Sequence, residues 1–183
     1  MEKKRVVVTG MGIISPVGTG LNKFWDSLVK GKSGIDKITR FDTSDLPSRI
    51  AGEVRDFNPE AYIEKKELKR LDRFTQFAIS ATKMALEDAD LDLSTVDKTR
   101  IGVILGSGIG GNATWEEQHS ILLSKGPKRV SPFFIPMMIV NMASGQVSMA
   151  FGLKGPNFTV VTACASGTNA IGEAFRTLQR GDA

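Results

Sequence analysis

The sequence predicts an α/β fold in layers, with buried helices around a mixed, largely parallel sheet. Three short runs rich in Val and Ile each end in a turn of small residues, and segments of helical periodicity separate the runs. Uninterrupted apolar runs of this kind are typical of strands that are covered on both faces. Because strands alternate with helices along the chain, we expect parallel strands joined by helical crossovers.

The three predicted strands are short and lie far apart in the chain. They occupy residues 5–9, 101–105 and 157–162. Glycines follow the first two strands, at 10 and 12 and at 106 and 108, and we interpret them as places where the backbone approaches a neighbouring element closely. Residues 33–59 are expected to form a long connection.

Four helices are predicted between and after the strands. They span residues 21–31, 72–89, 137–151 and 166–180. The last helix carries an apolar stripe, made of Ile171, Ala174, Phe175 and Leu178. Gly181 follows it directly and is its expected C-cap.

Residues 130–153 contain no charged side chain, and a stretch of this length raises the question of a membrane span. Pro132 and Pro136 interrupt its beginning. The side chains of Asn141, Ser144 and Gln146 would need hydrogen-bond partners in lipid. We therefore expect a helix that is buried on most sides within the protein, and no insertion into a membrane.

Composition narrows the class of protein. The 183 residues are 41% hydrophobic and carry a formal net charge of +4, which describes a globular protein with too small a basic surplus to indicate nucleic-acid binding. One cysteine and one histidine allow neither an internal disulfide nor a zinc site built from such ligands. Because the first residues show no leader pattern, the cytoplasm is the expected location.

Three strands alone leave the edges of a sheet exposed and its core incomplete. The last predicted helix would normally lead into a further strand. We therefore expect residues 1–183 to be the amino-terminal part of a larger protein.

Cys164 is the only cysteine, and it lies where the third predicted strand turns into the last predicted helix. The N–H groups at the start of a helix favour a thiolate and are able to hold the oxyanion of an attacked carbonyl. This context favours a nucleophile for acyl transfer through a thioester. The alternative is a buried small hydrophobic residue, which the small neighbours of Cys164 disfavour.

Two other features compete weakly with this interpretation. Residues 106–111 match the G-x-G-x-x-G pattern of dinucleotide-binding sites, but no acidic residue ends a following strand about 20 residues later. Cofactor binding is therefore disfavoured. His119, the only histidine, lies in a polar stretch with nothing to place it beside Cys164, so the partner group in catalysis is expected outside these residues.

A basic cluster lies in residues 64–73. With helical spacing, its members share one face: Lys66, Lys69, Arg70 and Arg73. Such a face would suit an acidic partner, and a solvated helix surface is the alternative explanation. No aromatic residue lies among these charges, which further disfavours nucleic acid as the partner.

Four segments together resemble the chain-elongating β-ketoacyl-acyl-carrier-protein synthases of type II. They are VVVTGMGIISPVGTG, GSGIGG, SPFFIPMMIVNMASGQVSMAFGLKGPN and, around Cys164, TACASGTNAIGEAFR. The resemblance covers residues 5–183. It implies a thiolase-like fold, in which two similar halves pack as an αβαβα sandwich and two subunits form a homodimer. Residues 1–183 would supply most of the first half.

The resemblance also implies a reaction and its residues. Cys164 would take the acyl chain from acyl carrier protein, and the enolate from a decarboxylated malonyl carrier would attack that chain to give a 3-oxoacyl carrier in fatty acid synthesis. Ile109 resembles the residue at the floor of the acyl pocket, and Phe134 the aromatic that reaches into the partner subunit's pocket. A basic patch of the family meets the acidic carrier protein, and it is matched here by Lys66, Lys69 and Arg70.

The family uses two histidines, a lysine and a gating phenylalanine from its second half, and these have no counterpart in residues 1–183. The isolated chain is therefore expected to be inactive. Three alternatives stay open: a polyketide-type ketosynthase, a non-catalytic module that binds the carrier or dimerises, and, least favoured, a nucleotide-binding oxidoreductase.

Overall fold

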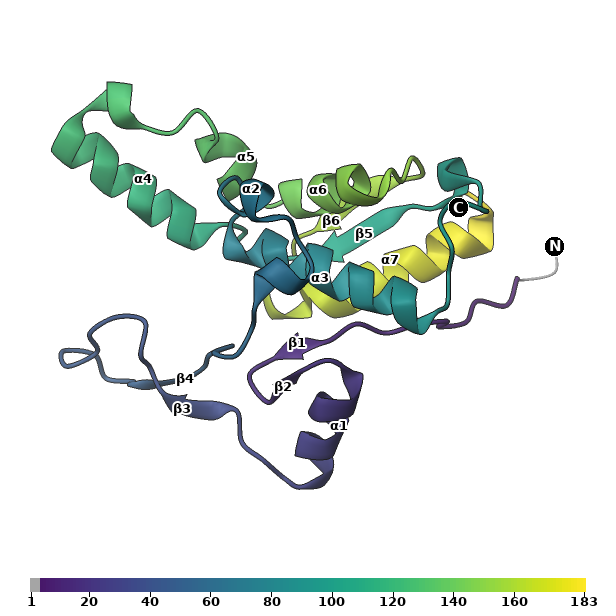
Figure 1. Cartoon of the computed structure of the whole chain (residues 1–183), viewed down its shortest axis with the longest axis horizontal. Helices are drawn as coiled ribbons and strands as arrows, with labels where there is room; N and C mark the ends of the chain where they lie inside the picture. The colour runs from purple at the N-terminus through teal and green to yellow at the C-terminus, as the bar shows by residue number, and fades with distance from the viewer. Residues whose placement is uncertain (1–3) are drawn as a thin grey trace.

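The computed structural model describes residues 4–183, and Figure 1 shows how their helices and strands are arranged. Within this range the strands form three two-stranded sheets. Two pairs are antiparallel, namely β1 (Ile14–Ser15) with β2 (Gly18–Thr19) and β3 (Ile35–Lys37) with β4 (Ile50–Gly52). The third pair, β5 (Val103–Gly106) with β6 (Asn157–Val160), is parallel and places Gly106 opposite Val160.

Residues 4–183 contain seven α-helices, where the sequence predicted four. They are α1 (Leu21–Val29), α2 (Lys65–Leu68), α3 (Arg73–Asp88), α4 (Asn112–Lys125), α5 (Phe134–Met138), α6 (Met142–Phe151) and α7 (Ser166–Arg180). Asp72 caps α3, because its carboxylate accepts the Phe74 N–H at 3.2 Å. Gly181 ends α7 in the left-handed conformation, with φ of +82°. The predicted helices 21–31, 72–89 and 166–180 are confirmed.

The parallel strands lie between two helices. α6 and α7 both contact β5 and β6, and Figure 1 shows the two helices on opposite sides of the strand pair. α3 packs along α6. The core forms where these elements meet and contains Ile63, Leu71, Ile79, Val103, Val147 and Leu153. The predicted α/β layering is confirmed.

The predicted strand at residues 5–9 is wrong. No strand among residues 4–183 pairs with this segment, and the side chains of Val7 and Val8 are exposed. The following backbone instead runs against α3, where a Cβ on Gly12 would overlap the Ala81 carbonyl. A run of Val residues without a hydrogen-bonded neighbour is not stabilised as a strand. The close approach predicted for Gly10 and Gly12 is confirmed.

The predicted helix at residues 137–151 is interrupted. Ile139 is extended, with ψ of 134°, and separates α5 from α6. The Met138 carbonyl accepts the Gly111 N–H at 2.9 Å, so the loop after β5 takes a bond that a continuous helix would use. The sequence pattern could not show this contact, because the two segments meet only in the folded chain.

The apolar stripe of α7 is only partly turned toward the sheet, because Ala174 and Leu178 border Ile104 of β5 whereas Ile171 and Phe175 do not. Small residues of this helix are buried instead, namely Ser166, Ala170 and Thr177. Ile171 is 73% exposed, and Phe175 and Leu178 are also exposed. These exposed apolar side chains agree with the prediction that the core is incomplete. None of the helices in residues 4–183 combines the length and the apolar character that crossing a membrane would require.

Candidate active site

The turn between β6 and α7 presents Cys164 to solvent. β6 ends at Val160, a 3₁₀ turn spans Ala163–Ala165, and α7 begins at Ser166. The Cys164 side chain is exposed. The predicted passage from strand to helix is confirmed. The alternative of a buried small hydrophobic residue does not hold for this chain.

Two polar side chains close this turn. The Ser166 hydroxyl accepts the Thr162 N–H at 2.9 Å and donates to the Ala163 carbonyl at 2.7 Å. The Asn169 amide donates to Thr162 Oγ1 at 2.9 Å. Between these bonds Ala163 has φ of +49°, a left-handed conformation that is uncommon for a residue with a side chain. The backbone is therefore held in a tight bend immediately before Cys164.

The backbone amide of Cys164 is available to a ligand. Its N–H donates to no acceptor within residues 4–183. α7 begins two residues later, so the positive end of the helix dipole lies beside this amide. An N–H in this position is able to donate to an oxyanion that forms next to the thiol.

The glycine-rich loop after β5 lies beside the cysteine turn. β5 and β6 are parallel neighbours, so the loops at their carboxyl ends leave from the same edge. A Cβ on Gly106 would overlap the Ser166 carbonyl, and one on Gly108 would lie 3.7 Å from the Ala163 carbonyl. Gly106 therefore allows the close backbone contact with the turn that was predicted, whereas the position of Gly108 has room for a Cβ.

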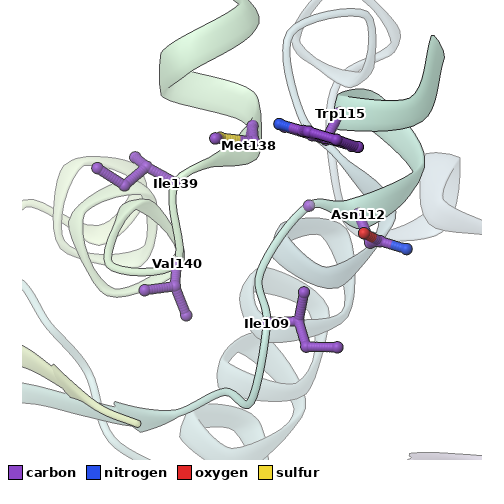
Figure 2. Close-up of a pocket in the computed structure, with 7 residues that line it drawn as sticks. Ile109, Asn112, Trp115, Met138, Ile139 and Val140 are labelled. Carbon is purple, nitrogen blue, oxygen red and sulfur yellow. The ribbon is translucent and has the colours of Figure 1, made fainter. Parts of the chain in front are cut away.

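A cavity of about 440 Å³ follows this loop (Figure 2). Figure 2 shows Ile109 and the first turn of α4 on one wall and the segment from Met138 to Val140 on the other. The lining is apolar apart from Asn112 and the backbone. Ile109 thus borders a cavity suited to an apolar chain. Phe134 begins α5 and does not line this cavity.

The three predicted carrier-binding residues differ in their contacts. Lys66 pairs with Glu64 at 2.7 Å, and this carboxylate raises the pKa of the Lys66 ammonium. The Arg70 guanidinium lies 4.8 Å from the centre of the Phe133 ring, in a cation–π contact. Lys69 makes no ion pair or cation–π contact within residues 4–183. Lys69 is therefore the one of the three whose charge has no ion pair or aromatic ring beside it in this part of the chain.

The prediction that Lys66, Lys69, Arg70 and Arg73 share one helical face is wrong, because only Lys66 lies within α2. α2 ends at Leu68, and Arg73 belongs to α3. Its guanidinium donates to the Val54 carbonyl at 2.6 Å and lies 4.9 Å from the centre of the Phe77 ring. Burial lowers the pKa of Arg73. Arg73 therefore packs inward rather than joining a basic surface.

His119 lies on α4 and is exposed. Its ring stacks on that of Trp115, with 5.4 Å between the ring centres. No contact of the Cys164 turn within residues 4–183 involves His119. The interpretation that it is not the base for Cys164 agrees with this placement.

The sequence did not identify several residues of the cavity. Trp115, Ile139 and Val140 line it, and none was predicted to do so. An aromatic residue shortly after a glycine-rich loop is the only signal for Trp115. The opposite wall reaches the cavity because the helix breaks at Ile139, which the sequence pattern did not show.

Comparison with known proteins identifies the family. Residues 3–183 match the family described as "Beta-ketoacyl synthase, N-terminal domain". The chain therefore belongs to the β-ketoacyl synthase family and corresponds to its N-terminal domain.

Curated relatives are closely similar in sequence. The chain is 56% identical over 182 residues to the 3-oxoacyl-[acyl-carrier-protein] synthase 2 of Staphylococcus aureus (strain COL). It is 53% identical over 181 residues to the protein of the same name from Synechocystis sp. (strain ATCC 27184 / PCC 6803 / Kazusa). These alignments cover 100% and 99% of this chain and 44% of each relative. The chain thus spans less than half the length of these relatives.

Solved structures of the family share the fold. The ishigamide ketosynthase/chain length factor superposes with a TM-score of 0.88 and 30% identity, over 99% of this chain and 45% of that one. A type II polyketide synthase acyl-carrier protein in complex with its ketosynthase gives 0.84 and 26% identity, over 100% and 49%. These similarities confirm the thiolase-like ketosynthase fold.

Proposed function

We propose that this chain is the acyl-accepting part of a 3-oxoacyl-acyl-carrier-protein synthase of fatty acid elongation. The observation that carries this proposal is the exposed Cys164 at a strand-to-helix turn, in a chain that belongs to the β-ketoacyl synthase family. The identity of 53–56% to proteins named 3-oxoacyl-[acyl-carrier-protein] synthase 2 supports the choice of reaction.

The first half-reaction uses groups of this chain. The Cys164 thiolate attacks the thioester carbonyl of acyl carrier protein, the carbon–sulfur bond to the carrier breaks, and the carrier leaves as a thiolate that takes up the proton Cys164 had lost on ionisation. The Cys164 N–H, which has no acceptor within residues 4–183, donates to the oxyanion of the tetrahedral intermediate. The acyl chain then extends into the cavity beside Ile109, whose bulk limits its length.

The second half-reaction needs groups from a further segment. A malonyl carrier loses carbon dioxide, and its enolate carbon attacks the acyl thioester and releases the Cys164 thiolate. We propose that residues 1–183 form an amino-terminal half-domain, since they span 44% of the curated relatives. A carboxy-terminal part would supply two histidines, a lysine and a phenylalanine and would cover the apolar face of α7 at Ile171 and Phe175.

A homodimer would complete the acyl pocket. Figure 1 shows α4 and α5 as an arm that extends from the body of the molecule. Leu123 is 75% exposed on this arm, and Ile135 is also exposed. The arm would pair with its copy and bring Phe134 to the partner's pocket. Leu123→Glu in the full-length protein should shift the mass measured by light scattering from dimer to monomer.

Acyl carrier protein is the proposed partner of Lys66, Lys69 and Arg70. A similar ketosynthase was solved in complex with an acyl-carrier protein. Exposed basic side chains attract an acidic protein over a distance of about a Debye length. The proposed location is the cytoplasm, and no cofactor is required for this chemistry.

A polyketide-type ketosynthase is the less favoured function. A type II polyketide synthase complex occurs among the similar structures, but at 26% identity. The relatives named 3-oxoacyl-[acyl-carrier-protein] synthase 2 reach 53–56%. We therefore retain fatty acid elongation as the conclusion.

The test compares the full-length protein with its Cys164→Ala variant. Incubation with acyl-acyl-carrier protein should add one acyl group to the intact mass of the wild type and none to that of the variant. The variant should form no 3-oxoacyl product from malonyl carrier. Equal product from both proteins would overturn the proposal. Carrier binding without an acyl adduct would favour a non-catalytic module, and product formed by residues 1–183 alone would contradict the half-domain assignment.

A further inference from the structure

One buried hydroxyl connects three residues of the turn that carries Cys164. Ser166 is 3% exposed, and its Oγ accepts the Thr162 N–H at 2.9 Å while donating to the Ala163 carbonyl at 2.7 Å. Both backbone groups belong to the two residues immediately before Cys164. A single side chain thus fixes the direction in which the chain arrives at the thiol.

The turn needs such a connection because of the backbone conformation of Ala163. Its φ of +49° places the methyl group close to its own backbone, which disfavours this conformation for residues other than glycine. A conformation of this kind persists where surrounding bonds hold it. Here the Ser166 hydroxyl holds the Thr162 N–H before the strained residue and the Ala163 carbonyl after its Cα.

Ser166 is itself fixed from the opposite side. The end of β5 packs against its backbone so closely that a Cβ on Gly106 would overlap the Ser166 carbonyl. Asn169, one turn further along α7, donates to Thr162 Oγ1 at 2.9 Å and secures the outer side of the same bend. The turn is therefore anchored to the sheet through Ser166.

We propose that Ser166 is a positioning residue, which holds the Cys164 thiol and N–H in the orientation needed for acyl transfer, with Asn169 in a supporting role. This inference rests on the proposed function of Cys164 as the acyl acceptor. The role requires a group that accepts one hydrogen bond and donates another. A hydroxyl meets this requirement, whereas an alanine methyl does not.

The test uses the full-length protein and three variants at this turn. Ser166→Ala should lower kcat for acylation by acyl-acyl-carrier protein about 10-fold or more, with KM for the carrier unchanged. It should also lower the rate at which iodoacetamide alkylates Cys164. Ser166→Thr keeps the hydroxyl and should stay within about threefold of the wild-type kcat. Asn169→Ala loses one exposed bond and should lower the alkylation rate about two- to threefold.

A second change separates positioning from general stability. Glycine adopts positive φ without steric cost, so Ala163→Gly in the Ser166→Ala protein should restore about half of the lost activity on a logarithmic scale. Ser148→Ala is the matched control, because the Ser148 hydroxyl also donates to a backbone carbonyl, that of Leu153, within α6 and its C-terminal turn. This control should leave acylation and alkylation unchanged.

Several outcomes would overturn the proposal. One is that Ser166→Ala keeps the wild-type alkylation rate and kcat. Another is that Ser148→Ala lowers both quantities as much as Ser166→Ala does. A third is that neither Ser166→Thr nor the added Ala163→Gly change shows a higher kcat than Ser166→Ala alone. If Ser166→Ala does not fold, the other two variants decide. The proposal is refuted if Asn169→Ala is alkylated at the wild-type rate and Ser166→Thr folds but is inactive. Alkylation of Cys164 needs no carrier protein, so it reports on the turn even if the proposed function is wrong. The proposed function itself is tested only by comparing the wild type with Cys164→Ala.

Discussion

Asp72 and Thr114 join the starts of two helices through one buried carboxylate. Asp72 Oδ2 accepts the Thr114 hydroxyl at 2.5 Å and the Thr114 N–H at 3.1 Å, while Oδ1 caps α3 by accepting the Phe74 N–H. Both residues are buried. The start of α4, which supplies Asn112 and Trp115 to one wall of the cavity, is thereby attached to the core helix α3.

Loss of this connection should destabilise the protein. Asp72→Ala removes an N-cap and leaves buried donors unpaired, so the free energy of unfolding should fall by about 2–4 kcal/mol. Thr114→Ala should cost about 1–2 kcal/mol, since it removes one of the three bonds. Urea unfolding followed by circular dichroism measures both. Thr114→Ser keeps the hydroxyl as the control, and a loss equal to that of Thr114→Ala would contradict the role of the bond.

Two buried serines should respond in opposite ways to loss of the hydroxyl. Ser80 and Ser144 are both 0% exposed. The Ser80 hydroxyl finds no partner within residues 4–183, whereas that of Ser144 donates to the Asn141 carbonyl and contacts Thr159 Oγ1 at 3.0 Å. Ser80→Ala should therefore leave the free energy of unfolding unchanged or raise it by about 1 kcal/mol.

Ser144→Ala should lower the free energy of unfolding by about 1–2 kcal/mol, because it leaves its partners unsatisfied. Thermal unfolding of the two variants in parallel checks the pair. A larger loss in Ser80→Ala than in Ser144→Ala would show that the Ser80 hydroxyl has a partner in the assembled protein.

The sequence predicted most of the cysteine turn, because its signals are local. A run of apolar residues, small residues around Cys164 and an amphipathic segment ending at Gly181 suffice to place a strand, a turn and a helix. The resemblance to a known family then added Ile109, which the structure places at the cavity.

Features that depend on distant contacts were not predictable in the same way. The break at Ile139 arises where the loop at Gly111 takes the Met138 carbonyl. The failed strand at residues 5–9 had the right composition but lacks a strand to pair with in residues 4–183. Arg73 had the spacing of a surface residue, but α2 ends too early to place it there.

The β3–β4 hairpin should lose stability in acid. Bonds to Arg55 lower the pKa of Asp36, and the Thr39 N–H is the largest cause of the lowered pKa of Glu53. A carboxyl whose pKa is lower in the folded state stabilises that state above its ordinary pKa, which is 3.8 for Asp36 and 4.5 for Glu53. The contribution is then lost as the pH falls through the lowered values.

Removal of Arg55 distinguishes the two causes. In Arg55→Ala, the pKa of Asp36 should rise more than that of Glu53, because Arg55 is the largest cause at Asp36, where the Lys37 N–H bond remains, whereas the Thr39 bonds to Glu53 are kept. Carboxyl carbon chemical shifts followed by NMR between pH 2 and 7 report each group. An equal rise at both carboxyls would contradict this assignment.

Charge reversal in the basic cluster should slow the encounter with acyl carrier protein. Lys69 has no ion pair within residues 4–183, so Lys69→Glu changes the charge without breaking an ion pair there. We expect the rate of carrier-dependent acylation at low salt to fall about 5- to 10-fold, and its dependence on salt to flatten. Stopped-flow acylation of the full-length protein at several salt concentrations measures both quantities.

Arg70→Glu should have a larger effect than Lys69→Glu, because it also removes the cation–π contact with Phe133 at the start of α5. Arg70→Gln removes the charge without reversing it and should fall between Arg70→Glu and the wild type. Lys30→Glu, at the residue that follows α1 and pairs with Asp26, is the control for net charge. If Lys30→Glu slows acylation as much as Lys69→Glu, the cluster acts only through the overall charge of the protein; if Lys69→Glu alone does so, the cluster is where the carrier docks.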